Sequence, residues 1–181
     1  MRLESFADFV ERVVRALNHS RLEYMFTGAL AASYYGRPRT TLDIDVVISA
    51  RRSNLVTLTK WLSKASLKIS QRKLESAWRS DYRIATLEDT KSPHTLDIIF
   101  SDRKLDRKIG RISGLSTYYE TPESLILAKL RMLKVTVQPE RAATDRADIK
   151  AILETTRIDL RSLREMAKGQ STSKILNDLV S

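Results

Sequence analysis

The stretch "TLDIDVVIS", residues 41–49, limits the possible folds of this chain more than any other. Aliphatic side chains alternate strictly with other residues there, at Leu42, Ile44, Val46 and Ile48. This period of two predicts a β-strand whose aliphatic face is buried. Asp43 and Asp45 then share the other face, with Cα atoms about 6.5–7 Å apart. Two carboxylates held so close repel each other unless a cation lies between them.

A second strand offers a third acid to the same cation. In "HTLDIIF", residues 94–100, Asp97 interrupts another apolar alternation, and mid-strand aspartate is against the propensity of that residue. If the two strands are neighbours, all three acids converge. Two alternatives stay open: Asp43 and Asp45 on an exposed edge strand that meets only water or arginines, and Asp97 in an ion pair with Arg83.

The identity of the cation follows from the ligands that the chain lacks. There is no cysteine and there are only two histidines, so a metal would depend on oxygen ligands. Oxygen ligands favour Mg²⁺ or Mn²⁺ over zinc. The absence of cysteine also agrees with a cytoplasmic location, and no run of 18 or more apolar residues predicts a membrane span.

The remaining periodicities predict an α/β (α+β) fold. A small mixed sheet is expected from strands at 22–28, 41–49, 81–88, 94–100 and 114–120, with helices at 4–18, 29–35 and 53–69. From Thr121, a predicted N-cap followed by Pro122, the patterns become helical. We therefore expect a core over residues 1–120 and a helical part over 121–181 packed on it, with one single domain as the alternative.

A glycine turn precedes the two acids and is typical of an anion site. A strand that ends at Gly28 and turns directly into a helix directs backbone N–H groups and the helix dipole at an anion. Ser33 adds a hydroxyl to this predicted cradle. The residues between the turn and the acids can bind triphosphate oxygens, and they are Arg37, Arg39, Thr40 and Thr41.

These residues together resemble the nucleotidyltransferase superfamily typified by DNA polymerase beta. Its motif is a hydrophobic residue, glycine, glycine or serine, then a gap and an Asp-hydrophobic-Asp/Glu-hydrophobic run. Here Phe26-Thr27-Gly28-Ala29 is followed by thirteen residues and then by Asp43-Ile44-Asp45-Val46. The stretch "GALAASYYGRPRTTLDID" is most similar to small prokaryotic and archaeal members, including relatives that act as abortive-infection type IV toxins.

The resemblance implies a function and a set of site residues. It implies transfer of a nucleoside monophosphate from a nucleoside triphosphate, ATP among them, with the metal on Asp43, Asp45 and Asp97. It further implies a role in activity for Lys129 and for one of Asp145 or Asp148. The helical pattern alone leaves open a surface lysine at 129 and helix-surface or N-terminal charge partners at 145 and 148. The nucleotide would be bound by Gly28, Ala29, Ser33, Arg37, Arg39 and Thr41. Ala29 departs from the family's glycine or serine, so a noncatalytic binding module, such as a toxin–antitoxin component, is the alternative.

The charge distribution indicates the acceptor. The formal net charge is +10, and residues 51–83 hold nine lysines and arginines against Glu75 and Asp81. Such a segment attracts polyanions. Trp61, Trp78 and Tyr82 lie among the cations, where bases can stack on aromatic rings. RNA, such as transfer RNA, is therefore the first expected acceptor and a partner protein the second.

Overall fold

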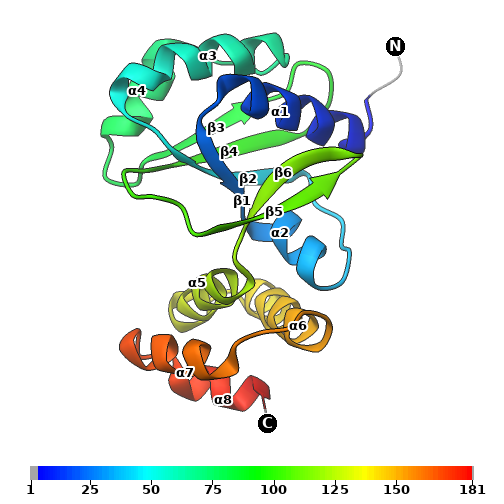
Figure 1. Ribbon diagram of the computed structural model, residues 1–181, viewed down its shortest axis with the longest axis vertical. Helices are drawn as coiled ribbons and strands as arrows, with labels where there is room; N and C mark the ends of the chain where they lie inside the picture. The colour runs from blue at the N-terminus through cyan, green and yellow to red at the C-terminus, as the bar shows by residue number, and fades with distance from the viewer. Residues whose placement is uncertain (1–3, 181) are drawn as a thin grey trace. The chain divides into compact units, whose positions relative to one another are not determined.

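The structure, a computed structural model, describes residues 4–180 and holds a six-stranded mixed sheet with eight α-helices in that range (Figure 1). This confirms the predicted mixed α/β class. The chain forms two compact units. The first unit comprises the chain up to Ala29 together with Thr40–Tyr119. The second unit comprises Leu30–Arg39 together with the chain from Glu120 onward.

The first unit contains the six strands. Its elements are α1 (Phe6–Ser20), β1 (Glu23–Phe26), the start of α2 (Gly28–Tyr35), β2 (Asp43–Ser49), the 3₁₀ turn η1 (Arg52–Asn54), α3 (Leu55–Lys64), α4 (Gln71–Arg79), β3 (Ile84–Glu88), β4 (Thr95–Ser101), β5 (Arg107–Ile112) and β6 (Leu115–Glu120). The strand order is β3-β4-β2-β1-β6-β5, so β3 and β5 form the two edges.

The core of the first unit lies under one face of this sheet. Helices α1, α3 and α4 are on that face (Figure 1), and the strand side chains toward it are 0% exposed at Ile44, Val46, Ile48, Leu96 and Ile98. β2 runs parallel to β4, while β3 and β1 run antiparallel to their partners β4 and β2. The predicted alternation in β2 and β4 is therefore the alternation between the core and the opposite face.

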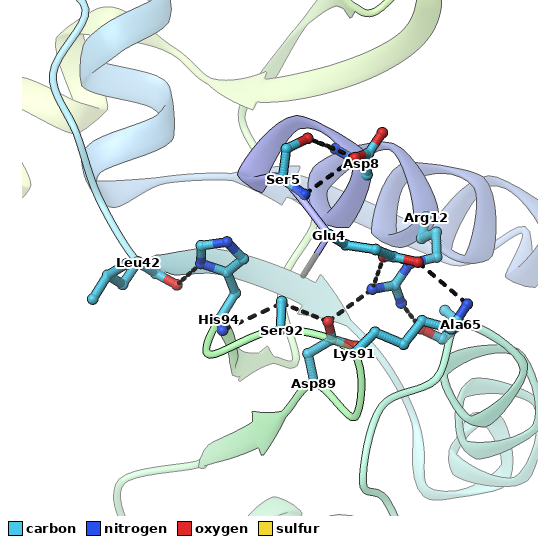
Figure 2. Close-up of polar contacts among 10 residues, drawn as sticks. All are labelled: Glu4, Ser5, Asp8, Arg12, Leu42, Ala65, Asp89, Lys91, Ser92 and His94. Carbon is cyan, nitrogen blue, oxygen red and sulfur yellow. Dashed lines mark hydrogen bonds and ion pairs between the residues drawn. The ribbon is translucent and has the colours of Figure 1, made fainter. Parts of the chain in front are cut away.

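A buried ion pair fastens the β3–β4 turn to α1 (Figure 2). The Arg12 guanidinium lies 2.8 Å from Asp89 Oδ2 and 2.7 Å from Glu4 Oε2. It also donates to the Ala65 carbonyl at the end of α3, and the Ser92 hydroxyl donates to Asp89 Oδ2 over 2.6 Å. Because the Asp89 side chain is 0% exposed, these donors replace the water that it loses on folding.

His94 joins the same region to the start of β2. Its ring packs on Phe9 and Phe6, with centroid distances of 5.4 and 5.2 Å. Its Nδ1 lies 3.3 Å from the carbonyl oxygen of Leu42, the residue before Asp43 (Figure 2). The aromatic end of α1 thus holds the entry to the first acidic strand.

The Arg12–Asp89 pair gives the stability of the protein a pH dependence. Burial alone would raise the pKa of Asp89, but hydrogen bonds from Arg12 and Ser92 and the Arg12 charge outweigh it and lower that pKa. A lowered folded-state pKa stabilises the protein above the unfolded value, about 3.9, and this stabilisation is lost as the pH falls through the folded value.

We expect Asp89→Asn to lower the free energy of unfolding at pH 7 by about 2 kcal/mol, because charge-assisted hydrogen bonds are lost. The difference from the parent protein should shrink below about pH 4. Urea unfolding at several pH values measures both effects. Asp81→Asn, at an exposed aspartate, is the matched control and should change stability by less than about 0.5 kcal/mol. A gap that stays constant with pH would contradict the ion-pair account.

The second unit is helical. It contains the rest of α2 together with α5 (Pro122–Val135), α6 (Pro139–Thr155), α7 (Leu160–Gly169) and α8 (Ser173–Val180). Thr121 is the N-cap of α5 and Pro122 lies in its first turn, as the sequence predicts. The turn after α2 is tied to α6, because the hydroxyls of Thr155 and Thr156 both donate to the Tyr35 carbonyl, over 2.5 and 2.6 Å.

Two elements lie outside the predictions from sequence. Helix α4 buries only Leu74 among nine residues, so its sequence carries almost no apolar period. Strand β5, "RKIGRI", is rich in cations and contains a glycine, both disfavoured in strands. Such a composition is characteristic of a protected edge strand.

Candidate functional site

The three predicted acids lie on one face of the sheet, opposite the helices of the first unit. β2 and β4 are neighbours in parallel register, and Asp45 is paired with Asp97. Asp43 stands two residues before Asp45 on the same side, next to Thr95. Neighbouring strands are about 4.8 Å apart, so Asp45 and Asp97 are side by side. The sequence could not show this pairing, because it depends on a parallel contact between distant segments.

Asp97 has a buried carboxylate oxygen without a partner. Its Oδ1 is buried and accepts no hydrogen bond from any residue that the structure describes. The competing partner Arg83 lies instead 3.3 Å from Asp102. An unsatisfied buried acceptor costs about 1–3 kcal/mol, and a cation beside it would remove that cost. Carboxylate oxygens are the ligands that a hard divalent ion such as Mg²⁺ prefers.

Gly28 is pressed against Asp45. Its φ is +58°, and a Cβ built on it would lie 2.1 Å from Asp45 Oδ2. The Thr27 N–H also donates to the Asp45 carbonyl over 3.0 Å. A side chain at position 28 would thus occupy the space in front of the carboxylate. Only a residue without a side chain lets the N-terminus of α2 approach the acidic strand so closely.

A pair of glycine variants separates this steric role from backbone strain. Gly28→Ala and Gly114→Ala both place alanine at positive φ, +58° and +78°, which costs about 1–2 kcal/mol each. At Gly114 an added Cβ meets nothing within 4 Å. We expect Gly28→Ala to lose clearly more unfolding free energy in urea titrations, because Asp45 must move. Equal losses of unfolding free energy in the two variants would show that a methyl group at position 28 does not displace Asp45.

Thr41 orients Asp43. Its hydroxyl lies 3.2 Å from both the carbonyl and the Oδ1 of Asp43, and the Asp43 N–H lies 3.4 Å from that hydroxyl. The predicted nucleotide ligand Thr41 is thus a neighbour of the first acid. Ala29, also predicted at the nucleotide, is 7% exposed in the first turn of α2.

The other predicted residues form a second cluster, inside the second unit. Lys129 on α5 is 6% exposed, and its Nζ lies 2.8 Å from both Asp145 Oδ1 and Asp148 Oδ2 on α6. Arg39 Nε lies 3.2 Å from Asp148 Oδ1, and the Arg39 N–H donates to the Ser33 hydroxyl over 3.3 Å. A series of polar contacts therefore connects the GRPR segment, residues 36–39, to α5 and α6.

The sequence presented Asp145 and Asp148 as alternatives, yet both bind Lys129. Their spacing of three residues on a helix places them on one face, which is the signal that could have assigned both. They are buried charge partners and not surface charges, at 8% and 7% exposed.

Arg37 lies at a shallow cavity of the second unit. It pairs with Glu154 over 2.9 Å and its side chain is 75% exposed. The cavity, about 350 Å³, is also lined by Arg39, Lys150 and Asp148. The two predicted phosphate-binding arginines thus line the same cavity.

The carboxylates of the described residues do not form a preorganised metal-binding site. Within residues 4–180, no group of three or more His, Asp or Glu side chains is arranged to hold an ion as it stands. Among the same residues, no helix has the length and apolarity needed to span a membrane.

Comparison with known proteins places the fold. No protein-family model matches the chain, and no curated protein matches its sequence. Among solved structures, ANT(2")-Ia in complex with adenylyl-2"-tobramycin matches with a TM-score of 0.63 and 14% identity, over 91% of this chain and 98% of that one. An antigenic nucleotidyltransferase-like protein from Paracoccidioides brasiliensis matches with a TM-score of 0.61 and 15% identity, over 98% and 93%.

A third solved structure belongs to the same group. The lincosamide antibiotic adenylyltransferase LnuA, bound to lincomycin, matches with a TM-score of 0.55 and 13% identity, over 86% of this chain and 100% of that one. The chain therefore has the nucleotidyltransferase fold.

Proposed function

We propose that this protein is a metal-dependent nucleotidyltransferase. It transfers a nucleoside monophosphate from a nucleoside triphosphate to an acceptor hydroxyl and releases pyrophosphate. The observation that carries the proposal is the juxtaposition of Asp45, Asp97 and Gly28, with a buried Asp97 oxygen unpaired and no room for a side chain at Gly28. Such a site can receive both a divalent ion and a phosphate.

Asp43, Asp45 and Asp97 would hold Mg²⁺ or Mn²⁺. When bound, the metal supplies charge neutralisation at the phosphate oxygens. Asp97 takes the proton of the acceptor hydroxyl, whose oxygen then forms a bond to the α-phosphorus while the bond to pyrophosphate breaks. Thr41 holds the Asp43 carboxylate in place through its hydroxyl.

The triphosphate would be held by backbone and cationic groups. Gly28 and Ala29 present the N–H groups of the first turn of α2, and alanine at 29 retains its N–H. The family resemblance adds Ser33, Arg37 and Arg39 as predicted phosphate ligands. In this proposal Lys129 sets the position of Arg39 through Asp148, since both cations contact that carboxylate.

RNA, such as transfer RNA, is the proposed acceptor. The net charge of +10 favours an anionic polymer. An acceptor that carries several positive charges would be repelled by a protein of this net charge. A partner protein is the second acceptor, and it would need its own acidic patch for the same reason.

The test is direct. The protein is incubated with each labelled triphosphate, Mg²⁺ and total RNA, and label on RNA and pyrophosphate release are measured. We expect both with at least one triphosphate, and neither when EDTA replaces Mg²⁺. Label on a protein from a cell extract, with none on RNA, would move the acceptor assignment to protein.

Ala29 favours one rival, a noncatalytic nucleotide-binding module within a toxin–antitoxin pair, because it replaces the glycine or serine of the family motif. Triphosphate binding without transfer to any acceptor, in the parent and in Ala29→Gly alike, would favour the rival. Activity that appears only in Ala29→Gly would identify Ala29 as the cause of a lost activity.

A further inference from the structure

A basic groove runs between α4 and the edge strand β3 in the first unit. Its volume is about 620 Å³, and its lining includes Ser70, Arg72, Lys73 and Ser76 beside α4 and Ile84 and Thr86 on β3. This size is in the range of ligand-binding cavities. No lining residue of the groove belongs to the acidic site, and the sequence did not predict α4.

The polar groups of the groove are available for a ligand. Among the described residues, Arg72 and Lys73 have no carboxylate within ion-pair distance. Glu88, which pairs with Lys68, also interacts electrostatically with Lys73, and Arg52 and Arg79 share Glu75. The hydroxyls of the lining residues Ser76 and Thr86 make no hydrogen bond within residues 4–180. Two cations and two hydroxyls in one groove are the groups that bind phosphates of a nucleic-acid backbone.

The sheet register connects the edge strand of the groove to the acidic site. Thr86 on β3 is paired with Asp97 on β4, and Asp97 is paired with Asp45 on β2. The three side chains form one row on the same face, and neighbouring strands are about 4.8 Å apart. Because α4 lies on the opposite face of the sheet from this row (Figure 1), a ligand in the groove would pass around the edge strand β3 at Thr86 and then meet Asp97.

We propose that this groove holds the RNA acceptor strand, with its phosphates on Arg72 and Lys73 and its terminal ribose hydroxyl directed to Asp97. The inference rests on the proposed function and adds the surface and the direction of the acceptor. The two cations favour a polyanion over a peptide that would pair with the edge of β3.

Most of the aromatic residues predicted to stack on bases are engaged in contacts within the protein. Lys64 Nζ lies 4.6 Å from the Trp61 ring centroid, and the His19 ring packs on the same indole at 4.8 Å. The Trp78 Nε1–H donates to the Ala50 carbonyl over 3.0 Å. Of the three, Tyr82, 86% exposed, remains open. We therefore expect the protein to bind the phosphate backbone of the RNA, with little dependence on base sequence.

A binding experiment without catalysis tests the groove. Labelled single-stranded RNA is titrated in EDTA without triphosphate, and the dissociation constant is followed over a range of salt concentrations. The double variant Arg72→Gln/Lys73→Gln should bind more weakly, with a salt slope lower by about 1.4, or 0.7 per lost phosphate contact.

Lys104→Gln/Lys108→Gln is the matched control. It removes the same charge from two exposed lysines near the opposite sheet edge, β5, and should leave the salt slope unchanged. Equal losses in both double variants would overturn the proposal, since binding would then follow net charge alone. Unchanged RNA binding in Arg72→Gln/Lys73→Gln would overturn it as well.

The direction of the strand has its own test. Because the chain contains no cysteine, Thr86→Cys and Ser76→Cys each provide a single attachment point for a photo-crosslinker. Thr86→Cys should crosslink nearest the acceptor terminus and Ser76→Cys further along the strand. The reverse order would overturn the assignment. If the protein binds RNA in the groove but transfers no nucleotide, the proposed function is refuted and the RNA-binding role of the groove is retained.

Discussion

Asp45→Asn is expected to reduce the rate of nucleotidyl transfer by about 10³-fold or more, the equivalent of about 4 kcal/mol in the transition state. Asparagine has the same shape as aspartate but lacks the charge that binds a divalent ion. Asp45 is paired with Asp97 and its Oδ2 faces Gly28, so the lost charge is at the centre of the site. Transfer is measured with saturating triphosphate and acceptor in Mg²⁺.

The control for this variant is Asp102→Asn. Asp102 is exposed and pairs with Arg83 outside the acidic row, so its loss should leave transfer within about twofold of the parent. Asp102→Asn should match the parent's free energy of unfolding in urea within about 0.5 kcal/mol, and Asp45→Asn should be at least as stable as the parent, because it removes a charge beside Asp97. Transfer by Asp45→Asn within about tenfold of the parent rate would remove the acidic site from the reaction.

Lys129→Met is expected to lower the free energy of unfolding by about 3–5 kcal/mol, because it leaves two buried carboxylates without their cation. Asp145 and Asp148 both lie 2.8 Å from Lys129 Nζ, and their side chains are 12% and 8% exposed. Arg39 compensates only Asp148. Methionine fills nearly the same volume, so the loss reports charge and not packing.

Lys134→Met provides the comparison within α5. Lys134 lies near the end of the same helix and is less buried than Lys129, so its replacement should change stability by less than about 0.5 kcal/mol. Restoring neutrality should also restore stability, so Lys129→Met combined with Asp145→Asn should recover part of the loss, because Arg39 still pairs with Asp148. A loss below about 1 kcal/mol in Lys129→Met would contradict the buried ion cluster.

A second substitution at position 129 tests the role in activity that the family resemblance implies for Lys129. Lys129→Arg keeps the charge and should retain most of the stability. If Lys129 acts through Arg39 and Asp148, Lys129→Arg should raise the KM for the triphosphate and leave kcat nearly unchanged. A fall in kcat with an unchanged KM would indicate direct contact with the reacting phosphate.

Local pattern was sufficient for much of the acidic site. The alternation around Asp43 and Asp45 predicted β2, the similar alternation around Asp97 predicted β4, and Gly28 predicted the turn into α2. Each depends on a period of two or on one residue's φ, which neighbouring residues determine. Elements with few apolar residues, such as α4 and β5, have no such period and were missed.

Pairings between distant segments could not be predicted in this way. The sequence offered Arg83 as a partner of Asp97, and the structure pairs it with Asp102. It treated Lys129 as a single functional residue, and packing of α5 on α6 buries it between two aspartates. Such contacts depend on which helices and strands are neighbours, a property of the whole chain.

The sequence by itself determined that two carboxylates share one face of a buried strand, that a glycine turn precedes them and that cations gather over residues 51–83. Only the tertiary structure decided that Asp97 stands beside Asp45, that Thr86 continues their row to the sheet edge beside a basic groove, and that Lys129 is enclosed by carboxylates. The physical reason is that side-chain direction follows local backbone geometry, whereas strand order and helix packing follow burial of apolar surface from the entire chain.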